Sequence, residues 1–166
     1  MPRIRGLLVA ATTALMLVAA AGINAGASES RLIEFDSMTP VTGAAVGAVN
    51  DRGITGGGLP WVISTGTGSV DRQGHVSVSV TGLVLPAVGN TTGPIKQFSA
   101  AVSCLTPDGV ENVTTGLFPT TSSGDSTIVA TVALPHPCKS PEVFVGTTRA
   151  NGQFIWFAQS NPESGD

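Results

Sequence analysis

An alternation of apolar and polar residues, without any helical period, most constrains what this chain can fold into. After Ser28 no stretch sustains a helical period over ten residues. In residues 75–84, valines at alternate positions are separated by serine or threonine, a pattern typical of a strand with one buried face. Residues 98–105 and 126–134 repeat this alternation. The sequence therefore predicts an all-β chain.

Pairs that end in glycine mark the turns between these strands. Asp108-Gly109 and Asn151-Gly152 readily take the positive φ that tight hairpins require, and residues 71–74 end in glycine as well. Together with the remaining apolar runs they predict eight or nine strands, at residues 32–36, 59–64, 68–70, 75–84, 98–105, 110–117, 126–134, 142–148 and 153–159.

Many short strands without helices indicate a sandwich or a barrel. We expect an all-β, two-sheet antiparallel sandwich of immunoglobulin-like architecture with one disulfide. Residues 143–145 and 154–157 are apolar on both faces, which predicts central strands. Trp61 precedes both cysteines and Trp156 follows both, whereas an immunoglobulin domain has a tryptophan between them. The expected likeness is therefore one of architecture.

The first 27 residues have the layout of a cleaved secretory signal. Arg3 and Arg5 precede an apolar run at residues 6–22, and the small residues Ala25-Gly26-Ala27 follow. Cleavage removes two arginines and no acid, so the net charge changes from −3 to −5. The sequence predicts a secreted, extracellular product with no membrane contact after cleavage. Retention of the short apolar run as an anchor is the alternative.

The mature chain is expected to hold one domain. Residues 28–52 either supply a first strand or lie loosely against it, residues 53–160 form the β-sandwich, and residues 161–166 form a tail. The six cations after the signal are scattered along the chain, so nucleic acid is not an expected partner. The bias toward Ala, Gly, Thr and Val, with little Lys, is typical of a GC-rich bacterial genome.

Cys104 and Cys138 are expected to form a structural disulfide, because thiols outside the cytoplasm can oxidise. Cys104 shares a strand face with Phe98 and Val102, so it should point into the core. A bridge to Cys138 closes a loop of about 35 residues. A redox role would favour a Cys-x-x-Cys pair, which the chain lacks.

Residues suited to catalysis or metal binding are sparse. His75 and His136 are the two histidines, with Asp71 across a turn from His75, and there is no G-x-S-x-G motif. Zinc needs three or four suitably spaced ligands. Calcium could draw oxygen ligands from separate loops, which contain Asp36, Asp51, Asp71, Asp108 and Asp125. We expect no catalytic residue, no metal and no cofactor.

The most unusual local segment is residues 53–61, which contain three consecutive glycines before a tryptophan. One interpretation is a ligand or partner loop made by Gly56, Gly57, Gly58 and Trp61. The other is a glycine-rich lead into a strand whose Trp61 fills the core. The segment lacks the lysine and the following helix of a phosphate loop.

Four fragments between residues 53 and 157 resemble a group of small secreted bacterial proteins of unassigned function. They are Gly56-Gly57-Gly58-Leu59-Pro60-Trp61, Val102-Ser103-Cys104-Leu105, Phe118-Pro119 and Leu134-Pro135-His136-Pro137-Cys138. The resemblance implies a shared scaffold and transfers no catalytic residue. In composition the chain is also similar to the apoproteins of enediyne chromoproteins, which are acidic, Gly/Ala/Thr/Val-rich sandwiches that carry a small molecule.

These observations favour a secreted, non-catalytic β-sandwich module with a binding or structural role outside the cell. Its partner would be an extracellular protein, an envelope component or a small ligand. Three alternatives stay open: a carrier of an apolar small molecule, a hydrolase that uses His75 or His136, and a protease inhibitor that presents residues 134–141.

Overall fold

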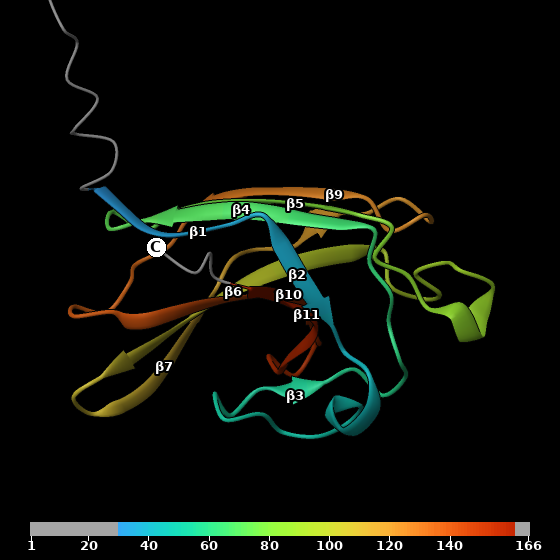
Figure 1. Cartoon of the computed structure of the whole chain (residues 1–166), viewed down its shortest axis with the longest axis horizontal. Helices are drawn as coiled ribbons and strands as arrows, with labels where there is room; N and C mark the ends of the chain where they lie inside the picture. The colour runs from blue at the N-terminus through green and yellow to red at the C-terminus, as the bar shows by residue number, and fades with distance from the viewer. Residues whose placement is uncertain (1–29, 162–166) are drawn as a thin grey trace, which may run out of the picture.

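Two antiparallel sheets face each other in the computed structural model of the protein, which describes residues 30–161 (Figure 1). The predicted all-β sandwich with one disulfide is confirmed. The predicted signal at residues 1–27 and residues 162–166 of the predicted tail lie outside the described residues. Within residues 30–161 no helix has the length and hydrophobicity needed to cross a membrane.

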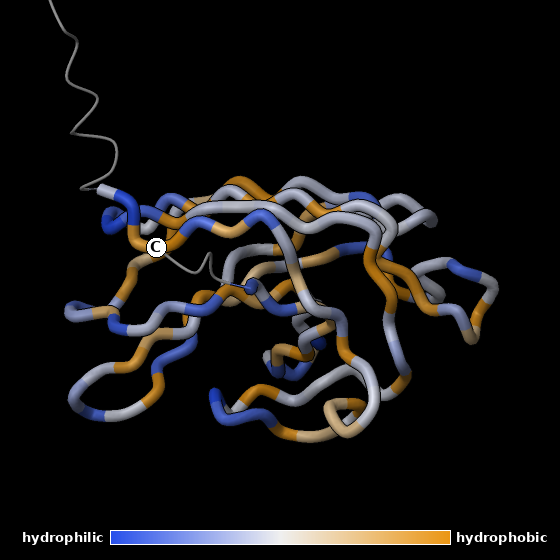
Figure 2. The backbone as a smooth tube through the Cα atoms, in the orientation of Figure 1, coloured by the Kyte–Doolittle hydropathy of each residue, from blue (hydrophilic) through white to orange (hydrophobic). Residues whose placement is uncertain are grey.

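The smaller sheet has four strands in the order β1-β4-β5-β9. Their bounds are β1 (Arg31–Phe35), β4 (Thr65–Asp71), β5 (His75–Thr81) and β9 (Ser126–Thr131). In β5 the valines are buried and the serines are exposed, as the alternation predicts. Figure 2 shows such alternation as short orange and pale segments along the strands of this layer. The sheet therefore buries one face and presents a face rich in hydroxyl groups to water.

The larger sheet has seven strands, with a main order of β2-β11-β10-β6-β7. Short strand β3 pairs with β11, and short strand β8 pairs with β6. The bounds are β2 (Ser37–Pro40), β3 (Thr55–Gly56), β6 (Gln97–Thr106), β7 (Gly109–Thr114), β8 (Phe118–Pro119), β10 (Lys139–Thr148) and β11 (Phe154–Asn161). Two 3-10 helices, η1 (Gly43–Ala45) and η2 (Pro86–Val88), lie in the connections.

All three predicted hairpins are present, joining β4 to β5, β6 to β7 and β10 to β11. Gly74, Gly109 and Gly152 take the positive φ expected of their turns. The two strands predicted to be central, β10 and β11, each have neighbours on both sides. The hydrophobic pattern and the turn residues therefore predicted these three hairpins and the two central strands, while the order of the strands in each sheet was not predicted.

The strand predicted at residues 59–64 is absent, and this prediction was wrong. The Trp61 N–H donates to the Val41 carbonyl, and Val62 makes only an isolated bridge with Val84. The chain therefore changes partners within a few residues, and no continuous ladder forms. Residues 30–52 contain β1 and β2, and the chain passes from the smaller to the larger sheet at Asp36.

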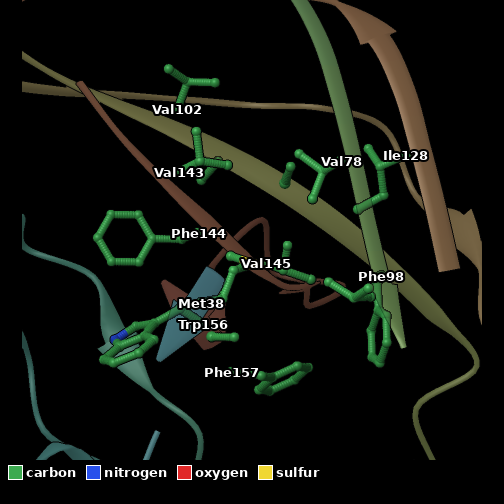
Figure 3. Close-up of a cluster of buried hydrophobic side chains, with 14 of the residues drawn as sticks. Met38, Val78, Phe98, Val102, Ile128, Val143, Phe144, Val145, Trp156 and Phe157 are labelled. Carbon is green, nitrogen blue, oxygen red and sulfur yellow. The ribbon is translucent and has the colours of Figure 1, made fainter. Parts of the chain in front are cut away.

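The main core lies between the two sheets. Val78 and Ile128 of the smaller sheet point toward the larger sheet, near Phe98 of β6 (Figure 3). Gly66 and Gly68 on β4 leave room for bulky neighbours, because a Cβ at either position would lie under 3 Å from Met38 or Phe35. Met38 of β2 and Phe35 of β1 thus fill the space beside Gly66 and Gly68 of β4.

The larger sheet has a second buried face. Residues 143–146 of β10 and 155–158 of β11 are all buried, so both faces of these strands are removed from water. Phe144 and Trp156 meet edge to face with ring centroids 5.7 Å apart. Both lie away from Val78 and Ile128 (Figure 3). A strand that is apolar on both faces needs a cover on each side.

Residues 41–57, called the covering loop below, provide the second cover (Figure 1, at β3 and below). Arg52 near its tip is only 6% exposed. The guanidinium donates to the Ser140 carbonyl at 2.9 Å and pairs with Glu142 at 2.8 Å. The Asn112 side chain on β7 donates to the Arg52 carbonyl at 2.8 Å. These bonds fasten the covering loop to β10 and β7.

The disulfide joins neighbouring strands of one sheet, unlike the inter-sheet bridge of antibody domains. Cys104 lies in β6, Cys138 immediately precedes β10, and Lys139 pairs with Leu105. Cys104 is fully buried and Cys138 is half-buried. The bridge therefore fixes the register at the end of the β6–β10 ladder.

Replacing Cys104 and Cys138 together by serine should lower the free energy of unfolding. The cysteines are 34 residues apart, and the chain-entropy model gives about 3–4 kcal/mol for a loop of this length. Urea unfolding of the oxidised protein and of the double variant measures the difference. A difference below about 1 kcal/mol would contradict a stabilising bridge.

Candidate functional site: an apolar groove beside the glycine-rich segment

A groove opens where the covering loop ends. Its volume is about 370 Å³, within the range of about 300–1,000 Å³ typical of small-molecule sites. Three segments far apart in sequence line it: residues 57–61, the β5–β6 connection and the β10–β11 hairpin. The lining residues are Gly57, Gly58, Leu59, Trp61, Leu85, Val88, Pro94, Ile95, Thr147, Arg149, Ile155 and Phe157.

Stacked aromatic rings form the buried part of this lining. The Trp61 ring stacks on Phe157 with centroids 4.0 Å apart and an interplanar angle of 18°. It also meets Phe98 edge to face at 6.3 Å. Trp61 and Phe157 are almost fully buried, whereas Leu59 and Val88 are 44% and 42% exposed. The groove thus has a rigid aromatic floor and an exposed apolar rim.

Gly57 allows the main chain to approach this aromatic stack. A Cβ at position 57 would lie 2.7 Å from Trp61 Nε1 and 3.2 Å from the Phe157 ring. The Gly57 N–H donates to the Trp156 carbonyl at 2.9 Å, which extends the parallel pairing of β3 with β11. A larger residue would push the segment away from the rings.

The structure places three of the four predicted loop residues, Gly57, Gly58 and Trp61, at the groove. Gly56 instead lies in β3, where a Cβ would collide with the Ala45 carbonyl. Trp61 combines features of both sequence interpretations, since it is buried in the core and also lines the groove. It does so outside any strand, contrary to the second interpretation.

Two lining residues are polar. The Thr147 hydroxyl donates its hydrogen bond to the Gln97 carbonyl at 3.1 Å, so this hydrogen is not available to a ligand. Arg149 is exposed, and its Nη1 is 3.5 Å from Gln153 Oε1. Arg149 is the one charged residue among the described residues of the lining. Sequence reasoning did not find it, because a lone arginine before an Asn-Gly turn has no distinguishing pattern.

A second depression, of about 580 Å³, lies on the smaller sheet beside Asp71 and His75. His75 Nδ1 is 2.6 Å from Asp71 Oδ2, while Asp71 Oδ1 accepts the backbone N–H groups of Gln73 and His75. Ser69 and Ser77 also line the depression, but neither of these described hydroxyls hydrogen-bonds to His75. The aspartate therefore serves the hairpin turn.

These bonds shift the pKa of the Asp71 carboxyl. Partial burial acts to raise the pKa. Four interactions lower it and outweigh burial: hydrogen bonds from the ring and the backbone N–H of His75, the electrostatic attraction of His75, and a hydrogen bond from the Gln73 N–H. The pKa therefore lies below its ordinary value of 3.8. The Asp125 carboxyl behaves similarly, because bonds from the Gly82 N–H, Ser123 and Thr121 lower its pKa.

The remaining candidates lie apart from the groove. His136 lines a small depression of about 110 Å³ with Leu134 and Cys138, and it is exposed. In residues 30–161 no group of three or more His, Cys, Asp or Glu side chains is arranged to hold a metal ion. Of the aspartates considered for calcium, Asp71 bonds to its own turn, and Asp125 bonds both to its own turn and to the distant Gly82 N–H.

Searches against protein-family models, curated proteins and solved structures find no match to this chain. The resemblance to small secreted bacterial proteins therefore stays a prediction.

Replacing Asp71 by asparagine should destabilise the protein at neutral pH. Because the folded pKa is lowered, the carboxylate contributes stability that is fully present above pH 3.8 and is lost as the pH falls through the lowered value. The difference in melting temperature between the two proteins should therefore shrink in acid. Thermal unfolding from neutral pH down to about pH 2 measures it.

The Asp108→Asn variant is the control, because the exposed Asp108 carboxylate makes no hydrogen bond within its described turn. Its melting temperature should follow that of the parent protein across the pH range. A constant deficit of the Asp71→Asn variant at all pH values would refute the assigned contribution of the carboxylate.

Proposed function

We propose that the protein is a secreted, non-catalytic β-sandwich module that holds an apolar small molecule in the groove. The observation that carries this proposal is an exposed apolar rim, with Leu59 and Val88, above the floor of Trp61 and Phe157. Burying this rim against an apolar ligand contributes about 25 cal/mol for each Å² removed from water.

A small ligand fits the groove better than a protein partner does. A stable protein interface buries a broad surface of about 800 Å² on each partner, whereas this site is a single concavity, and its volume of about 370 Å³ lies within the range of about 300–1,000 Å³ typical of small-molecule sites. The groove therefore favours a small ligand over an extracellular protein or an envelope component. It also favours the carrier of an apolar molecule over the hydrolase and the protease inhibitor. The rigid floor would need little rearrangement on binding.

Two observations support secretion and a non-catalytic role. The signal-like residues 1–27 and the disulfide both suit an oxidising compartment outside the cytoplasm. The Asp71 carboxylate is bonded to the turn and to His75, and the groove lining contains no histidine or carboxylate among residues 30–161. Such a site can bind and orient a molecule, but its lining offers no general acid or base.

Mass spectrometry of the protein released by its own host should give a chain that begins at Ser28. The mass should be two hydrogens below that of the reduced chain because of the disulfide. Under native conditions a small organic molecule should remain attached, and denaturation should release it. A native mass equal to the bare chain, together with no binding of added ligands, would contradict a carrier.

A neutral apolar dye such as Nile red should bind the purified protein in the groove. Replacing Leu59 or Val88 by aspartate should weaken binding at least tenfold, because each change places a charge on the apolar rim. Both residues are more than two-fifths exposed, so these variants should fold normally. Dye fluorescence during titration measures the dissociation constant.

The matched control is Val129→Asp, which changes a 63% exposed valine on the smaller sheet, outside the groove. Its dissociation constant should stay within about twofold of the parent value. Equal binding by all three variants would show that the dye binds elsewhere, and the proposed site would be wrong.

A further inference from the structure

We infer that the molecule held in the groove is amphipathic, with an apolar body and one carboxylate that pairs with Arg149. This inference rests on the proposed function and names the class of ligand. Among the described residues of the lining, Arg149 is the one charged side chain, Thr147 is the other polar one, and no acid is present. The complement of such a lining is an apolar molecule with a single negative end.

The position of Arg149 is fixed while its side chain stays accessible. Arg149 begins the turn between β10 and β11, where its backbone N–H donates to the Gln153 carbonyl at 2.9 Å. Its carbonyl accepts the Gly152 N–H, also at 2.9 Å. The tight turn thus holds the Cα in place at the end of the groove-lining strand, and the exposed guanidinium can turn toward a ligand.

The guanidinium has no carboxylate partner among residues 30–161. The ion pairs found there join Arg31 to Glu34, Arg52 to Glu142 and His75 to Asp71. The contact of Arg149 Nη1 with Gln153 Oε1, at 3.5 Å, is at the limit of a hydrogen bond. Most of the five guanidinium N–H donors are therefore available to a ligand.

An arginine in this setting suits a carboxylate specifically. Its planar fork donates two parallel hydrogen bonds to the two carboxylate oxygens. An apolar ligand body seated beside it excludes water, which strengthens the attraction between the charges. The whole chain carries a net charge of −3, so its overall field does not attract anions. A preference for an anionic ligand would then have to come from Arg149 itself.

Decanoate and decanol provide the test, because they share an apolar body and differ in the charged end. Binding is measured by tryptophan fluorescence in a Trp156→Phe background. The chain has two tryptophans and no tyrosine, so Trp61 at the groove becomes the one reporter. Trp156 Nε1 has no hydrogen-bond partner among the described residues, so phenylalanine loses no bond there.

We expect decanoate to bind about tenfold more tightly than decanol, and Arg149→Gln to abolish this difference. Decanol binding by Arg149→Gln is measured in parallel, so that a general loss of binding is distinguished from a loss of the preference for decanoate. The Arg149→Lys variant should keep part of the preference, since it retains the charge but not the fork. Added salt should weaken decanoate binding and leave decanol binding unchanged.

The matched control is Lys96→Gln. Lys96 follows Ile95 of the groove wall, but it does not line the groove, and its ammonium donates to the Gly93 carbonyl. The preference for decanoate should survive this change. Equal affinity for both probes, or a preference that survives Arg149→Gln, would overturn the carboxylate inference while the proposed function stands. Binding of neither probe, with no binding of Nile red, would overturn both.

Discussion

Residues 143–146 of β10 and 155–158 of β11 are buried on both faces of the larger sheet. The smaller sheet covers one face, and the covering loop must cover Phe144 and Trp156 on the other. Each aromatic side chain left in water would cost about 1.5–3 kcal/mol. The loop is held by the buried Arg52, whose charge is tolerated because Ser140 and Glu142 meet it. These bonds join the covering loop to the start of β10.

The groove is a consequence of that arrangement. After β3 the chain must leave the far side of the larger sheet and return toward β4, and it passes Phe157 on the way. Gly57 brings it close to the rings, and Trp61 fills the space beside them. The β5–β6 connection approaches from the other side and supplies Leu85 and Val88. The site thus lies where two connections meet, and the two sheets hold these connections in place. Binding sites are commonly formed by loops on such a scaffold.

Local sequence patterns predicted the elements whose partners are close along the chain. Asp108-Gly109 and Asn151-Gly152 marked their hairpins, because the turn and both strands are contiguous. Short strands such as β3 were missed because their pairing depends on a distant strand, β11. Residues 59–64 were wrongly predicted as a strand, because the chain changes hydrogen-bond partners there, and Leu59 and Trp61 line the groove instead. The three consecutive glycines in the sequence indicated one wall of the groove. Arg149 is distant from them in sequence, and only the fold brings it to the groove.

The position of β11 has a consequence for the order in which the molecule can fold. A chain is synthesised from its N-terminus, yet β2 and β3 both pair with β11, the last strand. The Asn161 side chain bonds to Ser37 across 124 residues of sequence. The pairing of β2 and of β3 with β11 therefore cannot form until β11 has been synthesised. Contacts of such long range make folding slow, and β11 brings β2 and β3 into the larger sheet together.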